Sequence, residues 1–125
     1  MSLQEDFSRP LSYQHIENSM RSSINQMTEL TAEYAKTMDA FSVAEATFKV
    51  AFAKSRLLAR AGGDKTKKVT ADYAEDIATV ETEAERFEME IARAKNDATR
   101  QALLSVRSRL EALRSLMASY REAGN

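Results

Sequence analysis

The sequence of 125 residues has no cysteine, one proline, three glycines and one histidine. Without cysteine, disulfide bonds and thiolate chemistry are excluded, which fits a protein of the reducing cytosol. A β-rich or loop-rich fold would need more glycine and proline at its turns. A lone histidine, His15, cannot complete a Cys-His or Ser-His-Asp arrangement. We therefore expect an all-α protein that is not an enzyme and needs no cofactor.

Long apolar runs are also missing. Apolar residues follow one another only a few at a time, far short of the roughly 20 that a membrane-spanning helix needs. The N-terminal residues MSLQEDFSRP are acidic and polar and lack the pattern of a signal peptide. The sequence therefore predicts a cytoplasmic protein without membrane contact.

The first half of the chain has the apolar period of a helix. Apolar residues recur every three or four positions without interruption, which is the spacing of one helix face. They are Tyr13, Ile16, Met20, Ile24, Met27, Leu30, Tyr34, Met38, Phe41, Ala44, Phe48 and Phe52. Ser12 is a suitable N-cap, and Gly62-Gly63 would supply a left-handed stop. We expect a flexible arm over 1–11 and a long helix over 12–61.

The second half repeats the pattern after a glycine- and lysine-containing loop over 62–70. Its apolar positions are Tyr73, Ile77, Val80, Ala84, Phe87, Ile91, Ala94, Ala98, Ala102, Val106, Leu110, Leu113, Met117 and Tyr120. Thr70 is a suitable N-cap. Asn96-Asp97 has the lowest helix propensity and is the place to expect a kink. The spacing predicts a second long helix over 71–122.

Two long helices and a short connector predict an antiparallel helical hairpin of coiled-coil character. One seam of this kind buries too little apolar surface, and the apolar face widens toward the C-terminus, so we expect a homo-oligomer larger than a dimer. The residues expected to form the self-association segment are Leu103, Leu104, Val106, Leu110, Leu113 and Met117.

Charge is distributed unevenly behind a net charge of -1. Residues 49–68 carry seven basic residues and one acidic residue, whereas residues 69–90 carry eight acidic residues and one arginine. The acidic run Glu81, Glu83, Glu85, Glu88 and Glu90 has no histidine beside it, so a solvated helix face explains it better than a metal site. No metal is expected.

The basic segment is the feature that points to a function. Cations at a helix end and its loop suit a phosphate backbone, whereas the alternative is a solvated tip that pairs with acidic residues of a neighbouring subunit. Lys49, Arg56 and Arg60 share a narrow arc of the helix, and Lys54 points elsewhere. The candidate nucleic-acid-binding residues are Lys49, Lys54, Arg56, Arg60, Lys65, Lys67 and Lys68. Phe48 and Phe52 fit the helix seam better than a base-stacking role.

The residues around this segment resemble a known family. The stretch EATFKVAFAKSRL over 45–57, followed by Gly62-Gly63-Asp64, is similar to the central segment of the UvsY family of phage recombination mediators. Lys54-Ser55-Arg56 stands where that family has a basic pair that holds single-stranded DNA. LEALRS over 110–115 resembles the family's C-terminal self-association helix.

The resemblance implies a function in DNA recombination. The protein would bind single-stranded DNA, help to displace single-strand-binding protein and load a recombinase, in the cytoplasm of the host cell if a phage encodes it. None of these steps requires covalent chemistry. The alternative is a structural coiled coil that does not bind DNA, such as a phage scaffold, a tail chaperone or an inhibitor of a host protein.

Overall fold

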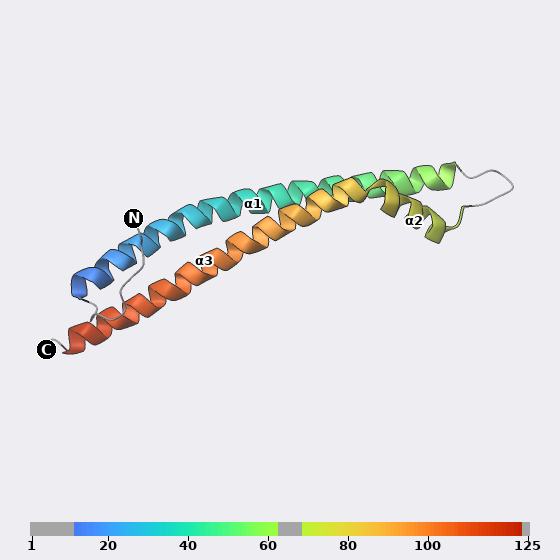
Figure 1. The fold of residues 1–125 in the computed structure, drawn as a ribbon. Coiled ribbons are helices and arrows are strands. Elements are labelled where there is room, and N and C mark those ends of the chain that lie inside the picture. The colour runs from blue at the N-terminus through green and yellow to red at the C-terminus, as the bar shows by residue number, and fades with distance from the viewer. Residues whose placement is uncertain (1–11, 63–68, 124–125) are drawn as a thin grey trace. The chain divides into compact units, whose positions relative to one another are not determined.

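A computed structural model describes residues 12–62 and 69–123 of the chain. These residues form three helices and no strand: α1 (Tyr13–Ala61), α2 (Ala71–Glu81) and α3 (Glu83–Ala123) (Figure 1). The all-α prediction is thus confirmed for the described part of the chain. The predicted arm over 1–11 and most of the loop over 62–70 lie outside the described residues.

Both predicted N-caps are present. The Ser12 hydroxyl accepts a hydrogen bond from the His15 N–H at 3.1 Å, and the Thr70 hydroxyl accepts one from the Tyr73 N–H at 3.2 Å. At the end of α1 the Gly62 N–H still donates to the Leu58 carbonyl at 2.9 Å. Gly62 does not have a positive φ, so the left-handed stop expected there is not formed by this residue.

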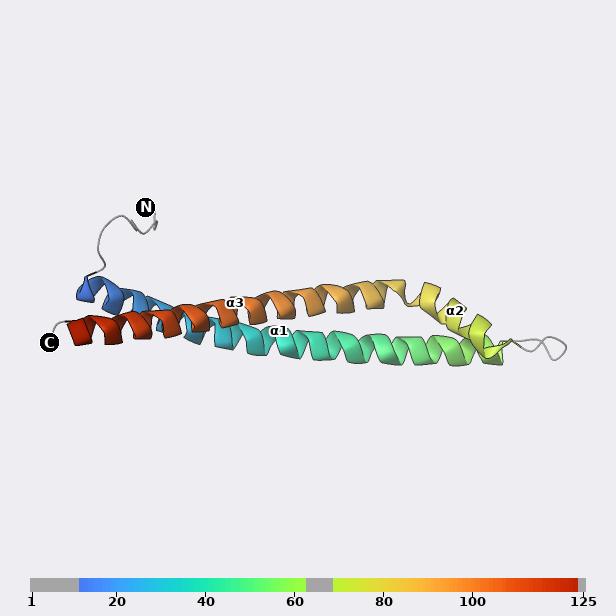
Figure 2. The ribbon, with the colours of Figure 1, turned by 90° about the horizontal axis from the view of Figure 1, so that it is seen from below.

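The expected single helix over 71–122 is two helices, and the break lies at Thr82 rather than near Asn96. Thr82 has φ -105° and ψ 21°, and its hydroxyl donates to the Ala78 carbonyl at 2.6 Å. The same hydroxyl-to-carbonyl bond occurs at Thr31 and Thr47 inside the unbroken α1, so this bond does not by itself interrupt a helix. Figure 2 shows the change of direction between α2 and α3.

Contacts divide the chain into two units. Unit 1 combines α1 up to Ala32 with α3 from Arg100 onward, and unit 2 runs from Glu33 to Thr99. Each unit pairs α1 with the returning part of the chain, as a helical hairpin requires. In unit 2 the Thr37 hydroxyl lies 3.1 Å from the Asn96 Oδ1 atom, and Ser55 donates to Glu81. Partner numbers fall as α1 numbers rise, so this pairing is antiparallel.

Unit 1 is packed with large apolar residues. Ile16, Leu110 and Met117 are buried, and the Tyr13 and Tyr120 rings lie 6.0 Å apart. Ser23 is also buried, at 1% exposure, and its hydroxyl has no hydrogen-bond partner among the described residues. The apolar stripe that predicts the second helix therefore does face α1 in this unit.

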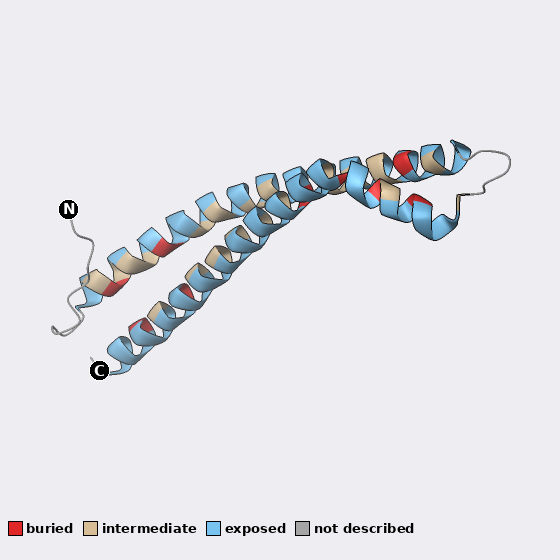
Figure 3. Ribbon diagram, turned by 45° about the vertical axis from the view of Figure 1, so that its right-hand side comes forward, coloured by how far each residue is buried: buried red, intermediate tan, exposed pale blue. Residues whose placement is uncertain are grey.

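Unit 2 is packed differently. Its buried positions on α2 and α3 are Ala74, Ala78, Thr82 and Met89, mostly small or polar residues. The expected seam residues Tyr73, Val80 and Phe87 are instead among the most exposed large apolar residues that the structure describes, at 59%, 73% and 66%. Figure 3 shows that buried positions are isolated along the helices. The assignment of these three residues to the intrachain seam is therefore wrong.

Candidate nucleic-acid interface

The described part of the candidate interface is the last third of α1, within unit 2. Lys49, Lys54, Arg56 and Arg60 all have exposed side chains. The other predicted DNA-binding residues, Lys65, Lys67 and Lys68, lie outside the described residues. Four of the seven predicted cations can thus be placed, and all four are on one helix.

The local packing of α1 explains why the cations point outward. Ser55 is 8% exposed and donates its hydroxyl hydrogen bond to the Glu81 carboxylate of α2. A residue that faces the partner helix directs its two sequence neighbours to the sides, because successive residues are about 100° apart on a helix. Lys54 and Arg56 therefore lie on opposite sides of α1.

The pairing of these cations determines how available they are. The Lys49 ammonium lies 3.3 Å from a Glu45 carboxylate oxygen one turn earlier, and 70% of its side chain is exposed. Such an exposed pair within one helix contributes only about 0.3–0.5 kcal/mol. Lys54, Arg56 and Arg60 form no ion pair with any residue that the structure describes. Little interaction energy would be lost if a phosphate replaced these contacts.

An acidic helix runs beside the basic one. The Ser55–Glu81 hydrogen bond places the end of α2 against α1, and α2 carries Asp72, Glu75 and Asp76 in addition to Glu81. These carboxylates repel a phosphate chain. A bound strand would therefore contact exposed surfaces of α1 that do not face α2.

The two phenylalanines of this segment are part of the helix pair. Phe48 and Phe52 are half-buried, and their rings contact each other with centroids 5.9 Å apart. Nearby, the Arg93 guanidinium of α3 stacks over the Phe41 ring at 5.3 Å. The aromatic side chains are thus engaged within unit 2, as the helical spacing of the sequence predicts.

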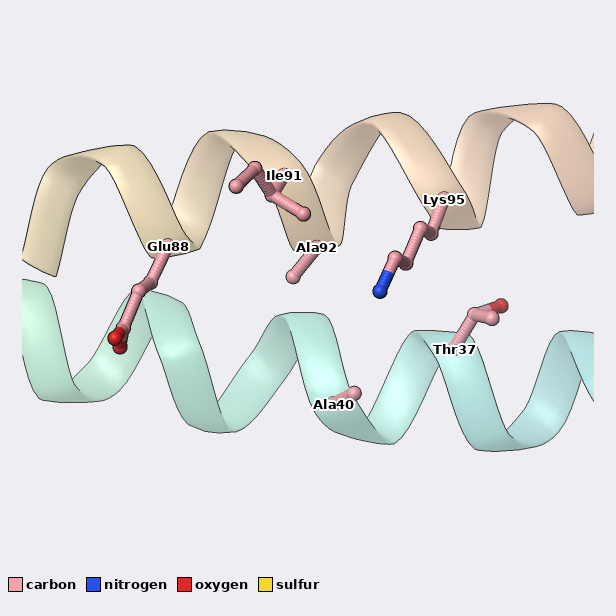
Figure 4. Close-up of a pocket in the computed structure, with 6 residues that line it drawn as sticks. All are labelled: Thr37, Ala40, Glu88, Ile91, Ala92 and Lys95. Atoms are coloured by element: carbon pink, nitrogen blue, oxygen red, sulfur yellow. The ribbon is translucent and has the colours of Figure 1, made fainter.

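A shallow groove lies between α1 and α3 further along unit 2. Its volume is about 200 Å³, and its lining residues are Thr37, Ala40, Glu88, Ile91, Ala92 and Lys95. Glu88 and Lys95 project from α3 toward α1 on either side of Ala92 (Figure 4). The groove is smaller than the roughly 300–1,000 Å³ of typical small-molecule sites. It therefore does not compete with the basic segment as a candidate site.

The predicted self-association residues lie in unit 1 and have different environments. Leu110 and Met117 are buried against α1, while Leu103, Val106 and Leu113 are half-buried. Leu104 is 42% exposed. The first two are engaged within the chain, whereas Leu104 is the most exposed of the six.

Other sites are not supported by the described residues. Among these residues no group of three or more acidic or histidine side chains could hold a metal ion. None of the described helices is both long and apolar enough to cross a bilayer. Comparisons with protein-family models, curated proteins and solved structures find no match to this chain. The geometry of the chain itself is therefore the basis for assigning a function.

The sequence pattern did not reveal two exposed apolar stripes of unit 2. Val43, Val50 and Leu57 recur every seventh residue on α1 and are 54–66% exposed. Tyr73, Val80 and Phe87 repeat the same interval on α2 and α3. The seven-residue interval between these apolar residues is the sequence feature that could have identified both stripes, since it marks a helix face that meets another helix.

Proposed function

We propose that the protein is a homo-oligomeric recombination mediator that binds single-stranded DNA through the basic face of α1. The observation that carries the proposal is the set of exposed cations, Lys54, Arg56 and Arg60, which lack ion-pair partners among the described residues. Arg56 and Arg60 lie about one turn apart on one side of α1 and Lys54 lies on the other, so together they offer phosphate contacts on both edges of its exposed surface. The resemblance of residues 45–57 to the UvsY family adds support.

The proposed mechanism is electrostatic. Phosphate contacts release condensed counterions from the strand, so binding needs no base contacts and has no sequence preference. An oligomer would present many copies of the basic face, and multivalency would turn weak contacts into stable binding. The near-neutral net charge of -1 would limit adhesion to other polyanions.

The partners follow from the resemblance alone. A mediator of this kind would work on strands covered by single-strand-binding protein and would help a recombinase to replace it. This work would take place in the cytoplasm, that of the host cell if a phage encodes the protein. No cofactor, metal or membrane is part of the proposal.

The test is a binding assay with fluorescent single-stranded DNA. Lys54→Ala with Arg56→Ala should lower the affinity about equally for every sequence and flatten its salt dependence, since two phosphate contacts are lost. The matched control is Arg107→Ala with Arg114→Ala, which removes the same charge from exposed positions of unit 1. The control should bind like the unmodified protein.

Two results would change the proposal. Normal binding by the double variant, with loss of binding in a variant that has alanine at positions 65, 67 and 68, would move the site to the loop. No binding by the unmodified protein at low salt would refute the mediator function. The structural coiled coil would then be the better description, because unit 2 has apolar stripes suited to another helix.

A further inference from the structure

Unit 2 has two exposed apolar stripes whose flanking charges have opposite signs. The basic-flanked stripe consists of Val43, Ala46, Val50, Ala53 and Leu57 of α1. The acidic-flanked stripe consists of Tyr73, Ile77, Val80, Ala84, Phe87, Ile91 and Ala94 of α2 and α3. All of these residues are exposed except Ile77, which is half-buried. Apart from Ile77 and Ile91, which lines the groove between α1 and α3, the stripes contribute little to the pairing of the described helices.

Both stripes have the residue spacing of a coiled-coil seam, and the acidic-flanked stripe continues across the break at Thr82. Their residues alternate in steps of three and four, which keeps one face of a helix toward a second helix. Val43 to Leu57 spans the same number of residues as Tyr73 to Phe87, with a large apolar residue at every seventh position. Ala46 and Ala53 leave space between the larger residues of the first stripe, into which Tyr73 and Phe87 could insert.

The residues beside each stripe determine which helix can pack on it. Positions next to the basic-flanked stripe hold Lys49 and Arg56 on one edge and Lys54 on the other, without an acidic residue. Next to the acidic-flanked stripe, one edge holds Asp76, Glu83 and Glu90, and the other holds Glu81, Glu88 and Lys95. Such flanking charges select the partner of a helical seam.

We infer that the basic-flanked stripe of one copy packs on the acidic-flanked stripe of a second copy. Two basic-flanked stripes would repel each other, as would two acidic-flanked stripes, so charge favours only the mixed pair. Each copy carries one stripe of each kind. The contact is therefore head-to-tail, and every bound copy offers a free stripe to the next, which gives a closed ring or an extending chain.

This contact shares cations with the proposed DNA site, so in the assembly a DNA strand would compete with the second copy's carboxylates for Lys49, Lys54 and Arg56. Lys49, Arg56 and Arg60 lie toward one side of the stripe and Lys54 toward the other, so the edges of the seam stay at the surface. Replacing Lys54 and Arg56 with alanine removes only exposed attractions and should leave the assembly intact. Replacing them with glutamate introduces repulsion along the whole seam.

The test uses charge reversal, measured by light scattering without DNA. The first variant is Lys49→Glu, Lys54→Glu and Arg56→Glu, and the second is Asp76→Lys, Glu83→Lys and Glu88→Lys. Each alone should fall to the single-chain mass of 14.0 kDa while circular dichroism retains its helical signal. All six changes in one chain, or a mixture of the two variants, should restore the larger mass.

A control variant separates the contact from a general charge effect. Glu29→Lys, Glu33→Lys and Glu122→Lys change the net charge as the second variant does, but none of these exposed residues flanks a stripe. This control should keep the mass of the unmodified protein.

Three results would overturn the inference: an unmodified protein of 14.0 kDa, a large mass in both reversed variants, or a mixture that stays at 14.0 kDa. Because DNA is absent, an assembled protein that does not bind DNA would refute only the proposed function.

Discussion

Unit 1 and unit 2 are both pairs of α-helices, but they bury their large apolar residues to different extents. Unit 1 buries Ile16, Leu110 and Met117 between its helices. Unit 2 packs on Ala74 and Ala78, which are 0% exposed, and leaves larger residues at its surface. Apolar burial is the main favourable term in both folding and association. Unit 1 therefore gains more from packing within the chain, whereas the exposed apolar residues of unit 2 are those of the proposed seam.

The largest expected effect comes from charge in the packed part of unit 1. Leu110→Asp with Leu113→Asp should destabilise the fold by at least about 3 kcal/mol, because an unpaired charge would be buried. Helical circular dichroism should weaken and the melting temperature should fall sharply. A variant that melts like the unmodified protein would show that Leu110 is not part of the core.

Introducing two aspartates into the exposed stripe of unit 2 should change the assembly rather than the stability of the single chain. Val80→Asp with Phe87→Asp changes residues that are 73% and 66% exposed, so the free energy of unfolding of the single chain should shift by less than about 1 kcal/mol. The mass in solution should fall, because the charges would lie in the proposed seam. Loss of helix comparable to that of the unit 1 variant would contradict the division between the units.

A smaller effect is expected at two buried serines, one in each unit, that differ in hydrogen bonding. The Ser23 hydroxyl of unit 1 lacks a partner among the described residues, whereas Ser55 of unit 2 donates to Glu81. Ser23→Ala should stabilise the protein by roughly 1 kcal/mol and Ser55→Ala should destabilise it by a similar amount. Thermal melts of the two variants should move in opposite directions. If both melting temperatures moved in the same direction, the two hydroxyls would not differ in hydrogen bonding as described.

The sequence predicts α1 well and the return of the chain less well. The steps of three and four give the bounds of α1 correctly, and Ser12 and Thr70 are recognisable caps. In unit 2 the three-four spacing does not identify the buried face, because residues 73–94 contain two stripes of apolar residues on different faces. Periodicity selects the one with the larger side chains, whereas the structure buries alanines, which allow the helix backbones to approach closely.

The break at Thr82 has no proline or glycine to signal it. Thr82 is buried at 3% exposure, and the neighbouring Glu81 accepts a hydrogen bond from Ser55, which is distant in sequence. Asn96 is the weaker helix former, yet α3 passes through it without interruption. Tertiary contacts override local propensity at both places.

The basic residues of the candidate site could be predicted from the sequence, but whether each of them already forms an ion pair could not. The cation count alone identifies the last third of α1 as basic. It does not reveal that Lys49 has Glu45 as a neighbour while Lys54 has no ion pair among the described residues. It also does not show that the same segment carries an exposed apolar stripe, because Val50 and Leu57 could equally have faced α2.

The most direct test of the proposed function is the affinity of the unmodified protein for single-stranded DNA as salt is varied. The account predicts binding at low salt on any sequence and a linear fall of log affinity with log salt, at about 0.7 per phosphate contacted. With several cations engaged, the slope should exceed about 2 in magnitude. No binding at low salt, or an affinity that does not change with salt, would contradict the account.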